Sequence, residues 1–150
     1  MKNKFLILFT FLLLTNCEYK PIYSVENFDF KLKNIINQND NRLNSKINRR
    51  LKNFSNKESQ KEIDLVLDVK KKINTLSKDT KGDPSRYEMI ININLKIKSN
   101  ENKNLVSSFE EKFNYNTNTN KFELSQYETE IENLLIEKII DNIIIYLSKI

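Results

Sequence analysis

The chain has a single thiol, Cys17, which lies just after an apolar run, and it has no histidine. A thiolate is a nucleophile and a metal ligand, but one cysteine without histidine forms neither a zinc cluster nor a nucleophile–base pair. Gly82 is the only glycine, so a glycine-rich phosphate loop is excluded as well. These absences argue against most enzymes. The chemistry left to Cys17 is the acceptance of a covalent group.

Four cations in the second half of the chain could bind anionic groups such as phosphates. They are Lys78, Lys81, Arg86 and Lys121, and we call them the basic rim. The first three fall in residues 76–86, which contain the glycine and a proline and are therefore predicted to form a turn. The fourth follows the polar run 116–120. A solvated loop cation is the alternative for each of them.

The first residues have the pattern of a secretory signal peptide. Lys2 and Lys4 make the start positive, and the apolar run Phe5 to Leu14 that follows has ten residues. A bilayer-spanning helix needs about twenty apolar residues, so this run is too short to cross a membrane. Leu14-Thr15-Asn16-Cys17 resembles the lipobox of bacterial lipoproteins, in which the chain is cut before the cysteine and the thiol is acylated.

The lipobox divides the chain into three predicted parts. Residues 1–16 are the lipoprotein signal peptide, 17–27 the lipid-attached tether, and 28–150 a single domain. The covalent lipid on Cys17 is the only prosthetic group that we expect, with no other cofactor and no metal.

Four segments of this domain alternate apolar and polar residues with a period of two, which predicts strands with one buried face. They are residues 28–33, 63–73, 87–97 and 105–115. In the last of these, Glu111 falls on the apolar side, which indicates a bulge or an edge strand.

Two segments have apolar residues at helical spacing. Residues 43–54 predict an amphipathic helix with Asp40 as its N-cap. Residues 126–149 predict a long helix that begins after the capping box formed by Ser125 and Glu128.

The predicted order is therefore βαβββα, an α/β two-layer sandwich in which a four-stranded mixed sheet has both helices packed on one face. The helix between the first two strands allows a parallel crossover, and the last three strands form an antiparallel meander. In such a meander the turn 76–86 and the end of the fourth strand lie at the same end of the sheet. The basic rim would gather there, flanked by Tyr87, Tyr115 and Phe122.

With this order, the sequence resembles the LptE family of lipopolysaccharide-assembly lipoproteins. Residues 17–23, CEYKPIY, are similar to the Cys-Gly-Phe-Arg-Pro-Leu-Tyr start of some members. The helix 42–51 and the stretch 85–91, SRYEMII, are also similar to family segments. The strand 109–116 and the terminal helix follow in the family's order.

The resemblance implies a non-enzymatic lipoprotein, anchored by its acyl chains on the periplasmic side of the outer membrane. Members sit in the lumen of the outer-membrane β-barrel LptD, help that barrel to fold and help to deliver lipopolysaccharide to the cell surface. The implied partners are therefore an LptD-type barrel, lipopolysaccharide and outer-membrane lipid. The family's basic lipopolysaccharide contacts map to Lys78 or Lys81 and to Lys121.

Two other functions are weighed against this one. A free periplasmic lipoprotein with a structural role in the envelope would have the same signal and tether. A nucleic-acid binder is suggested only by the net charge of +5 and the pI of about 9.2, and export argues against it. An enzyme is less favoured still, because neighbouring carboxylates such as Glu110 and Glu111 lie on opposite faces of a strand.

Overall fold

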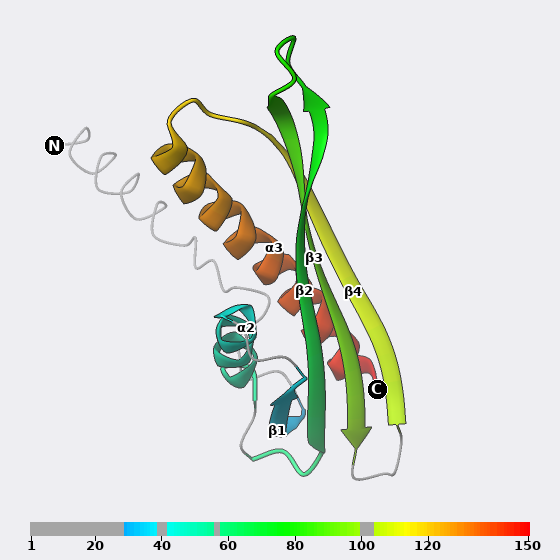
Figure 1. Cartoon of the computed structure of the whole chain (residues 1–150). Helices are drawn as coiled ribbons and strands as arrows, with labels where there is room; N and C mark the ends of the chain where they lie inside the picture. The colour runs from blue at the N-terminus through cyan, green and yellow to red at the C-terminus, as the bar shows by residue number, and fades with distance from the viewer. Residues whose placement is uncertain (1–28, 39–41, 56–57, 100–103) are drawn as a thin grey trace, which may run out of the picture.

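The structure is a computed structural model that describes residues 29–38, 42–55, 58–99 and 104–150 (Figure 1). Its elements follow the order βαβββα, which confirms the predicted fold class: β1 (Lys31–Asn37), α2 (Arg42–Lys52), β2 (Glu62–Lys78), β3 (Pro84–Ser99), β4 (Asn104–Asn116) and α3 (Lys121–Lys149). The predicted signal peptide, the tether with Cys17, and the proposed N-cap Asp40 lie outside the described residues.

The four strands form one sheet in the order β1-β2-β3-β4. The β1 strand pairs with β2 in parallel, across the connection that contains α2, while the other two pairings are antiparallel. Both the crossover and the meander are therefore confirmed. At one end of the sheet Arg86 pairs with Ser77 on one side and Asn116 on the other, so the β2–β3 hairpin and the end of β4 lie together.

One face of the sheet is covered by both helices and holds the core. The α2 helix contacts β1 and β2, α3 contacts β3 and β4, and the two helices touch each other. Figure 1 shows α3 running obliquely along the sheet. The buried strand residues alternate, as a pleated sheet with one covered face requires: Ile63, Leu65, Leu67 and Val69 on β2, and Met89, Ile91, Ile93, Leu95 and Ile97 on β3.

Burial along β2 ends at Val69, halfway along the strand. The α2 helix has 11 residues and is therefore about 16 Å long, whereas the 17 residues of β2 extend over more than three times that length. The short helix thus covers only the first half of β2. The second half continues into the hairpin with β3, which projects past the end of β4 (Figure 1).

The first strand differs from its prediction, because it spans Lys31–Asn37 instead of residues 28–33. Phe30 is fully buried but precedes the strand. The apolar alternation of Phe30 and Leu32 therefore begins before β1 pairs with β2. The register with β2 shifts between Leu32 and Asn34, and this irregularity resets the alternation. As a result Ile35 lies against the core and Ile36 on the open face.

The unusual position of Glu111 is explained by the edge of the sheet. The β4 strand is an edge strand, and its register with β3 is unbroken, so of the two predicted explanations the edge is confirmed. Glu111 lies on the helix-covered side, where the Nδ2 atom of Asn142 on α3 donates to its Oε1 atom over 3.4 Å. An inward-facing charge of this kind discourages a further strand from pairing with the edge.

The terminal helix begins earlier than predicted, and the predicted capping box is wrong. Asn120 is the N-cap: its side-chain oxygen accepts from the backbone N–H groups of Phe122 at 3.0 Å and Glu123 at 3.4 Å. Its Nδ2 atom donates to the Glu123 carboxylate at 2.9 Å. Ser125 lies inside the helix. None of the described helices is long and apolar enough to cross a bilayer.

Two alanine variants distinguish the observed cap from the predicted one. Asn120→Ala should lower the free energy of unfolding by about 1 kcal/mol, because two N–H groups lose their acceptor. Ser125→Ala should leave it unchanged or raise it slightly, because alanine has the higher helix propensity in a helix interior. Urea denaturation measures both. A larger loss from Ser125→Ala than from Asn120→Ala would contradict the assignment.

Candidate functional site

The basic rim lies at the hairpin end of the sheet, but its four cations do not surround one cavity. Lys78 is the last residue of β2, Lys81 is in the turn, and Lys121 is the first residue of α3. Arg86 lies within β3, not in the turn, because hairpin pairing continues through Ser77. Its position in the alternation places it on the face opposite the buried Met89. All four side chains are exposed.

The hairpin turn is organised by the carboxylate of Asp79. Its Oδ1 atom accepts from the backbone N–H groups of Lys81 at 2.8 Å and Asp83 at 2.9 Å. Gly82 has a φ of 88°, which glycine adopts without the steric penalty of a Cβ atom. These hydrogen bonds and the glycine stabilise the turn, and the Lys81 side chain on it is exposed.

A groove of about 530 Å³ lies between the hairpin turn and the start of α3. It is lined by Lys121 and by three carboxylates, those of Asp79, Asp83 and Glu128, together with Pro84, Tyr87 and Leu124 among others. An anion inside the groove would meet more negative than positive charge. The cations are better placed to hold phosphates along the outer edge of this end than within the groove.

A cluster of three tyrosines includes Tyr87, which lines this groove. The rings of Tyr87 and Tyr115 stack with centroids 5.5 Å apart, and Tyr127 meets Tyr115 edge-on at 6.2 Å. The Tyr115 hydroxyl donates to the Glu128 carboxylate over 2.7 Å. Burial, followed by this hydrogen bond, raises the pKa of Tyr115 well above its ordinary value. Phe122, predicted to flank the rim, is largely exposed.

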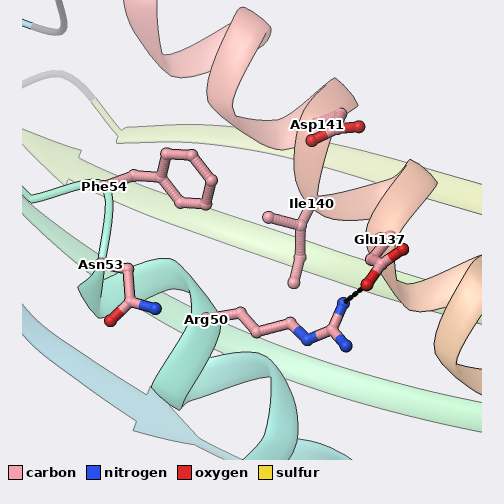
Figure 2. A pocket seen from close by; sticks show the side chains of 6 residues that line it. All are labelled: Arg50, Asn53, Phe54, Glu137, Ile140 and Asp141. Atoms are coloured by element: carbon pink, nitrogen blue, oxygen red, sulfur yellow. Dashed lines mark hydrogen bonds and ion pairs between the residues drawn. The ribbon is translucent and has the colours of Figure 1, made fainter. Parts of the chain in front are cut away.

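A second cleft, of about 240 Å³, lies where the C-terminal end of α2 meets α3 (Figure 2). Arg50 forms an ion pair with Glu137 over 2.7 Å at one side, and Phe54 and Ile140 supply apolar walls. Burial and the nearby charge of Glu137 both raise the pKa of Asp141, whose carboxylate lies on the α3 side. The cleft holds no cation apart from the paired Arg50, so an anionic ligand is not favoured there.

A three-residue ion cluster joins α2, α3 and β2. The Glu132 carboxylate accepts from the Lys46 ammonium at 2.5 Å and from the Lys71 ammonium at 2.8 Å. Only 13% of the Glu132 side chain is exposed. Burial alone would raise the pKa of Glu132, but hydrogen bonds and charges from the two lysines outweigh it, and the net pKa is lowered. Because its three members come from three elements, this cluster fixes the helices on the sheet.

Some of these residues had a signal in the sequence and others had none. Asn120 and Glu123 have the spacing of a capping box. Ser125 and Glu128, five residues later, have the same spacing, and the prediction used that second pair. Asp79 precedes the lone glycine in a turn segment, where aspartate commonly accepts backbone N–H groups. Glu132 carries no such signal, because its partners lie 61 and 86 residues away.

Within the described ranges, no three His, Cys, Asp or Glu side chains lie close enough together to hold a metal ion. The side chains of these ranges could instead bind a ligand through cations and hydrogen-bonding groups.

Comparison with known families identifies the family of this chain. The model of the family LptE, lipopolysaccharide-assembly, matches residues 29–147. This chain belongs to the LptE family. The membership confirms the resemblance seen in the sequence and makes the chain a lipopolysaccharide-assembly protein of the cell envelope. The LptE family is one of assembly proteins and not of enzymes.

Solved structures support the same LptE fold. The rare lipoprotein B from Shewanella oneidensis is 16% identical, with a TM-score of 0.58 over 79% of this chain and 94% of that one. Uncharacterized lipoprotein B from Nitrosomonas europaea is 14% identical, with a TM-score of 0.59 over 81% and 83% of the two chains. A minor lipoprotein from Acinetobacter baumannii is 8% identical, with a TM-score of 0.58 over 81% and 92%. No match was found among curated proteins.

Proposed function

We propose that this LptE-family protein is an outer-membrane lipoprotein, acylated on Cys17, that fits inside an LptD-type β-barrel. There it assists folding of the barrel and the delivery of lipopolysaccharide to the cell surface, which it contacts through the basic rim. The acyl chains are its only prosthetic group, and it performs no catalysis. The family match over residues 29–147 is the observation that carries this proposal.

The open face of the sheet supports a position inside a barrel. It is dominated by polar and charged side chains such as Asp64, Asp68, Asn92, Lys96 and Glu110. The lumen of a large outer-membrane barrel is polar, in contrast to its lipid-facing exterior. A sheet with one sealed face and one polar face can therefore lie against the inner wall without exposing a large apolar surface.

The hairpin end supports contact with phosphorylated lipid. Three lysines of the rim, Lys78, Lys81 and Lys121, are exposed there, and Asp79 is already engaged by two backbone N–H groups. Glu128 is likewise engaged by Tyr115. Hydrogen bonds within the protein thus engage two of the three carboxylates that line the groove, Asp79 and Glu128, while the three lysine side chains are exposed. Ammonium groups bind phosphate as strongly hydrated point charges.

The rim is tested by exchanging its three lysines for serine. Exposed charge pairs each contribute about 0.5 kcal/mol. The Lys78→Ser, Lys81→Ser, Lys121→Ser protein should therefore bind lipopolysaccharide about tenfold more weakly. Binding is measured with purified lipopolysaccharide, and co-purification of the barrel from outer membranes should be unaffected. The matched control exchanges Lys98, Lys138 and Lys149, which are also exposed, and should bind as the wild type does.

The same experiment separates the barrel plug from a free periplasmic lipoprotein. A free lipoprotein would recover no barrel from outer membranes, and the rim variant would grow with an intact envelope. Equal affinity of the rim and control variants for lipopolysaccharide would remove the rim as the contact site.

A further inference from the structure

The hairpin turn, residues 79–83, lies between two lysines of the rim but has no apolar core beneath it. Burial along β2 ends at Val69, and residues 75–83 are all exposed. A segment with so few buried contacts keeps its conformation only through its own hydrogen bonds and backbone preferences. The conformation in which Lys78 and Lys81 meet a ligand therefore depends on polar contacts within the turn.

Asp79 supplies most of these polar contacts. The pairing of β2 with β3 is irregular on both sides of Ser77, so the regular ladder stops before the turn. Beyond it, the backbone N–H of Asp79 donates to the Asp83 carbonyl over 2.8 Å, and the Asp79 carbonyl accepts from the Gly82 N–H over 3.1 Å. The Oδ1 atom of Asp79 adds two bonds, from the backbone N–H groups of Lys81 and Asp83. One of them holds the backbone of a rim lysine itself.

Gly82 contributes to the turn through its backbone alone. Its φ of 88° lies in the left-handed region, and a Cβ atom added there would meet no other atom within 4 Å. A substitution at Gly82 therefore strains the backbone without a steric clash and without a change of charge. The conformation of the turn can thus be disturbed independently of Asp79.

The carboxylate of Asp79 has a second, opposite effect, because it carries a negative charge. It lines the groove together with Asp83 and with Lys121 of the rim. Charges on a protein surface act on one another within a Debye length of about 8 Å. A phosphate held by the rim would therefore be repelled by Asp79, even while the hydrogen bonds of Asp79 order the turn.

We propose that Asp79 is a positioning residue of the basic rim. Its Oδ1 atom holds the turn in the conformation from which Lys78 and Lys81 bind phosphate, and its charge limits the affinity that they reach. Asp79 acts through the backbone of Lys81 and does not itself bind the ligand. This rests on the proposed function, because it requires that the rim contacts lipopolysaccharide.

The two effects have expected sizes. Each exposed lysine contributes about a factor of two to binding, so the two lysines of the hairpin contribute about fivefold together. Loss of their positioning cannot cost more than that, and we expect about threefold, because the ligand must then order the turn itself. Removal of one nearby negative charge, screened by solvent and salt, should strengthen binding about twofold.

Two substitutions at Asp79 separate the hydrogen bonds from the charge, with purified lipopolysaccharide as the probe. Asp79→Asn removes the charge but keeps an oxygen that accepts hydrogen bonds, whereas Asp79→Ala removes both. The asparagine variant should bind about twofold more tightly than the wild type, and the alanine variant about threefold more weakly than the asparagine variant. Gly82→Ala, which leaves every charge in place, should weaken binding as well, and Gly82→Asn should weaken it less, because asparagine tolerates a positive φ.

Asp83 provides the matched control, because its described hydrogen bonds use only its backbone. Asp83→Asn and Asp83→Ala remove the same charge and should bind alike. A second control repeats the Asp79 pair in the Lys78→Ser, Lys81→Ser protein. The difference between Asp79→Asn and Asp79→Ala should vanish there, because the side chains that Asp79 positions are gone. A difference that persists without the lysines would overturn the proposal.

Amide hydrogen exchange checks the turn directly. The N–H groups of Lys81 and Asp83 should exchange slowly in the wild type and in Asp79→Asn, and faster in Asp79→Ala. A wild type that binds no lipopolysaccharide would remove the rim, and this inference with it. If exchange of the rim lysines for serine weakens binding as expected, yet Asp79→Asn and Asp79→Ala bind equally well, this inference alone is overturned.

Discussion

Replacing Cys17 by serine should abolish acylation and, where the protein is made in excess of its barrel partner, release the excess from the membrane fraction. The serine hydroxyl is a far weaker nucleophile than a thiolate at neutral pH, so it cannot take the lipid in its place. Each buried CH₂ group contributes about 0.8 kcal/mol to membrane attachment, and two or more chains are needed for lasting binding. Incorporation of radiolabelled fatty acid, followed by fractionation, measures both effects. We expect the label to disappear and the excess protein to leave the membrane fraction.

A neighbouring substitution is the matched control for Cys17. Asn16 occupies the position before the cysteine, where lipoboxes resembling this one usually have a small residue. Asn16→Ala should therefore retain the label or increase it. Fatty acid that remains on the Cys17→Ser protein, or a wild type that carries none, would contradict the lipoprotein assignment.

Glu132→Gln should lower the free energy of unfolding by about 2 kcal/mol. The change keeps the shape of the side chain but removes the charge that two lysines share. Lys46 and Lys71 are only 16% and 27% exposed, so they would lose their counter-charge in a partly desolvated place. Urea denaturation measures the loss. Glu130→Gln, an exposed site on the same helix, should change stability by less than about 0.5 kcal/mol.

The contribution of Glu132 should depend on pH in a defined direction. Its folded pKa lies below the ordinary value of 4.5, so the unfolded chain takes up the proton first as the pH falls. The stabilisation is therefore complete above about pH 5 and is lost as the pH falls through the folded pKa. The difference in stability between wild type and Glu132→Gln should shrink over that range. A difference that is constant with pH would show that the loss comes from packing.

Much of the fold could be predicted because its signals are local. Alternation along residues 63–73 and 87–97 indicated the central strands, and these form the middle of the sheet as β2 and β3. The errors occurred where two local signals competed. At the start of α3, Asn120 and Ser125 both have capping patterns, and Asn120 prevails because the helix continues without interruption from Lys121.

The basic rim was only partly predictable for a related reason. The meander places Lys78, Lys81 and Lys121 at one end of the sheet, as the order of strands implied. The hairpin pairing continues past the irregularity near Ser77, and it places Arg86 within β3. The alternation of β3 then puts its side chain on the sheet face opposite the buried Met89. A shift of one residue moves a side chain across a sheet, and the residues of a turn do not encode that shift.

The sequence by itself determined the order of the elements, the single thiol and the apolar residues that each strand and helix buries. Those features follow from periodicity and residue type, which act over a few neighbouring positions. Only the tertiary structure decided that Lys46, Lys71 and Glu132 meet, and that Arg50 pairs with Glu137. Such pairings join residues far apart in the chain, and packing of the helices on the sheet, not local preference, selects them.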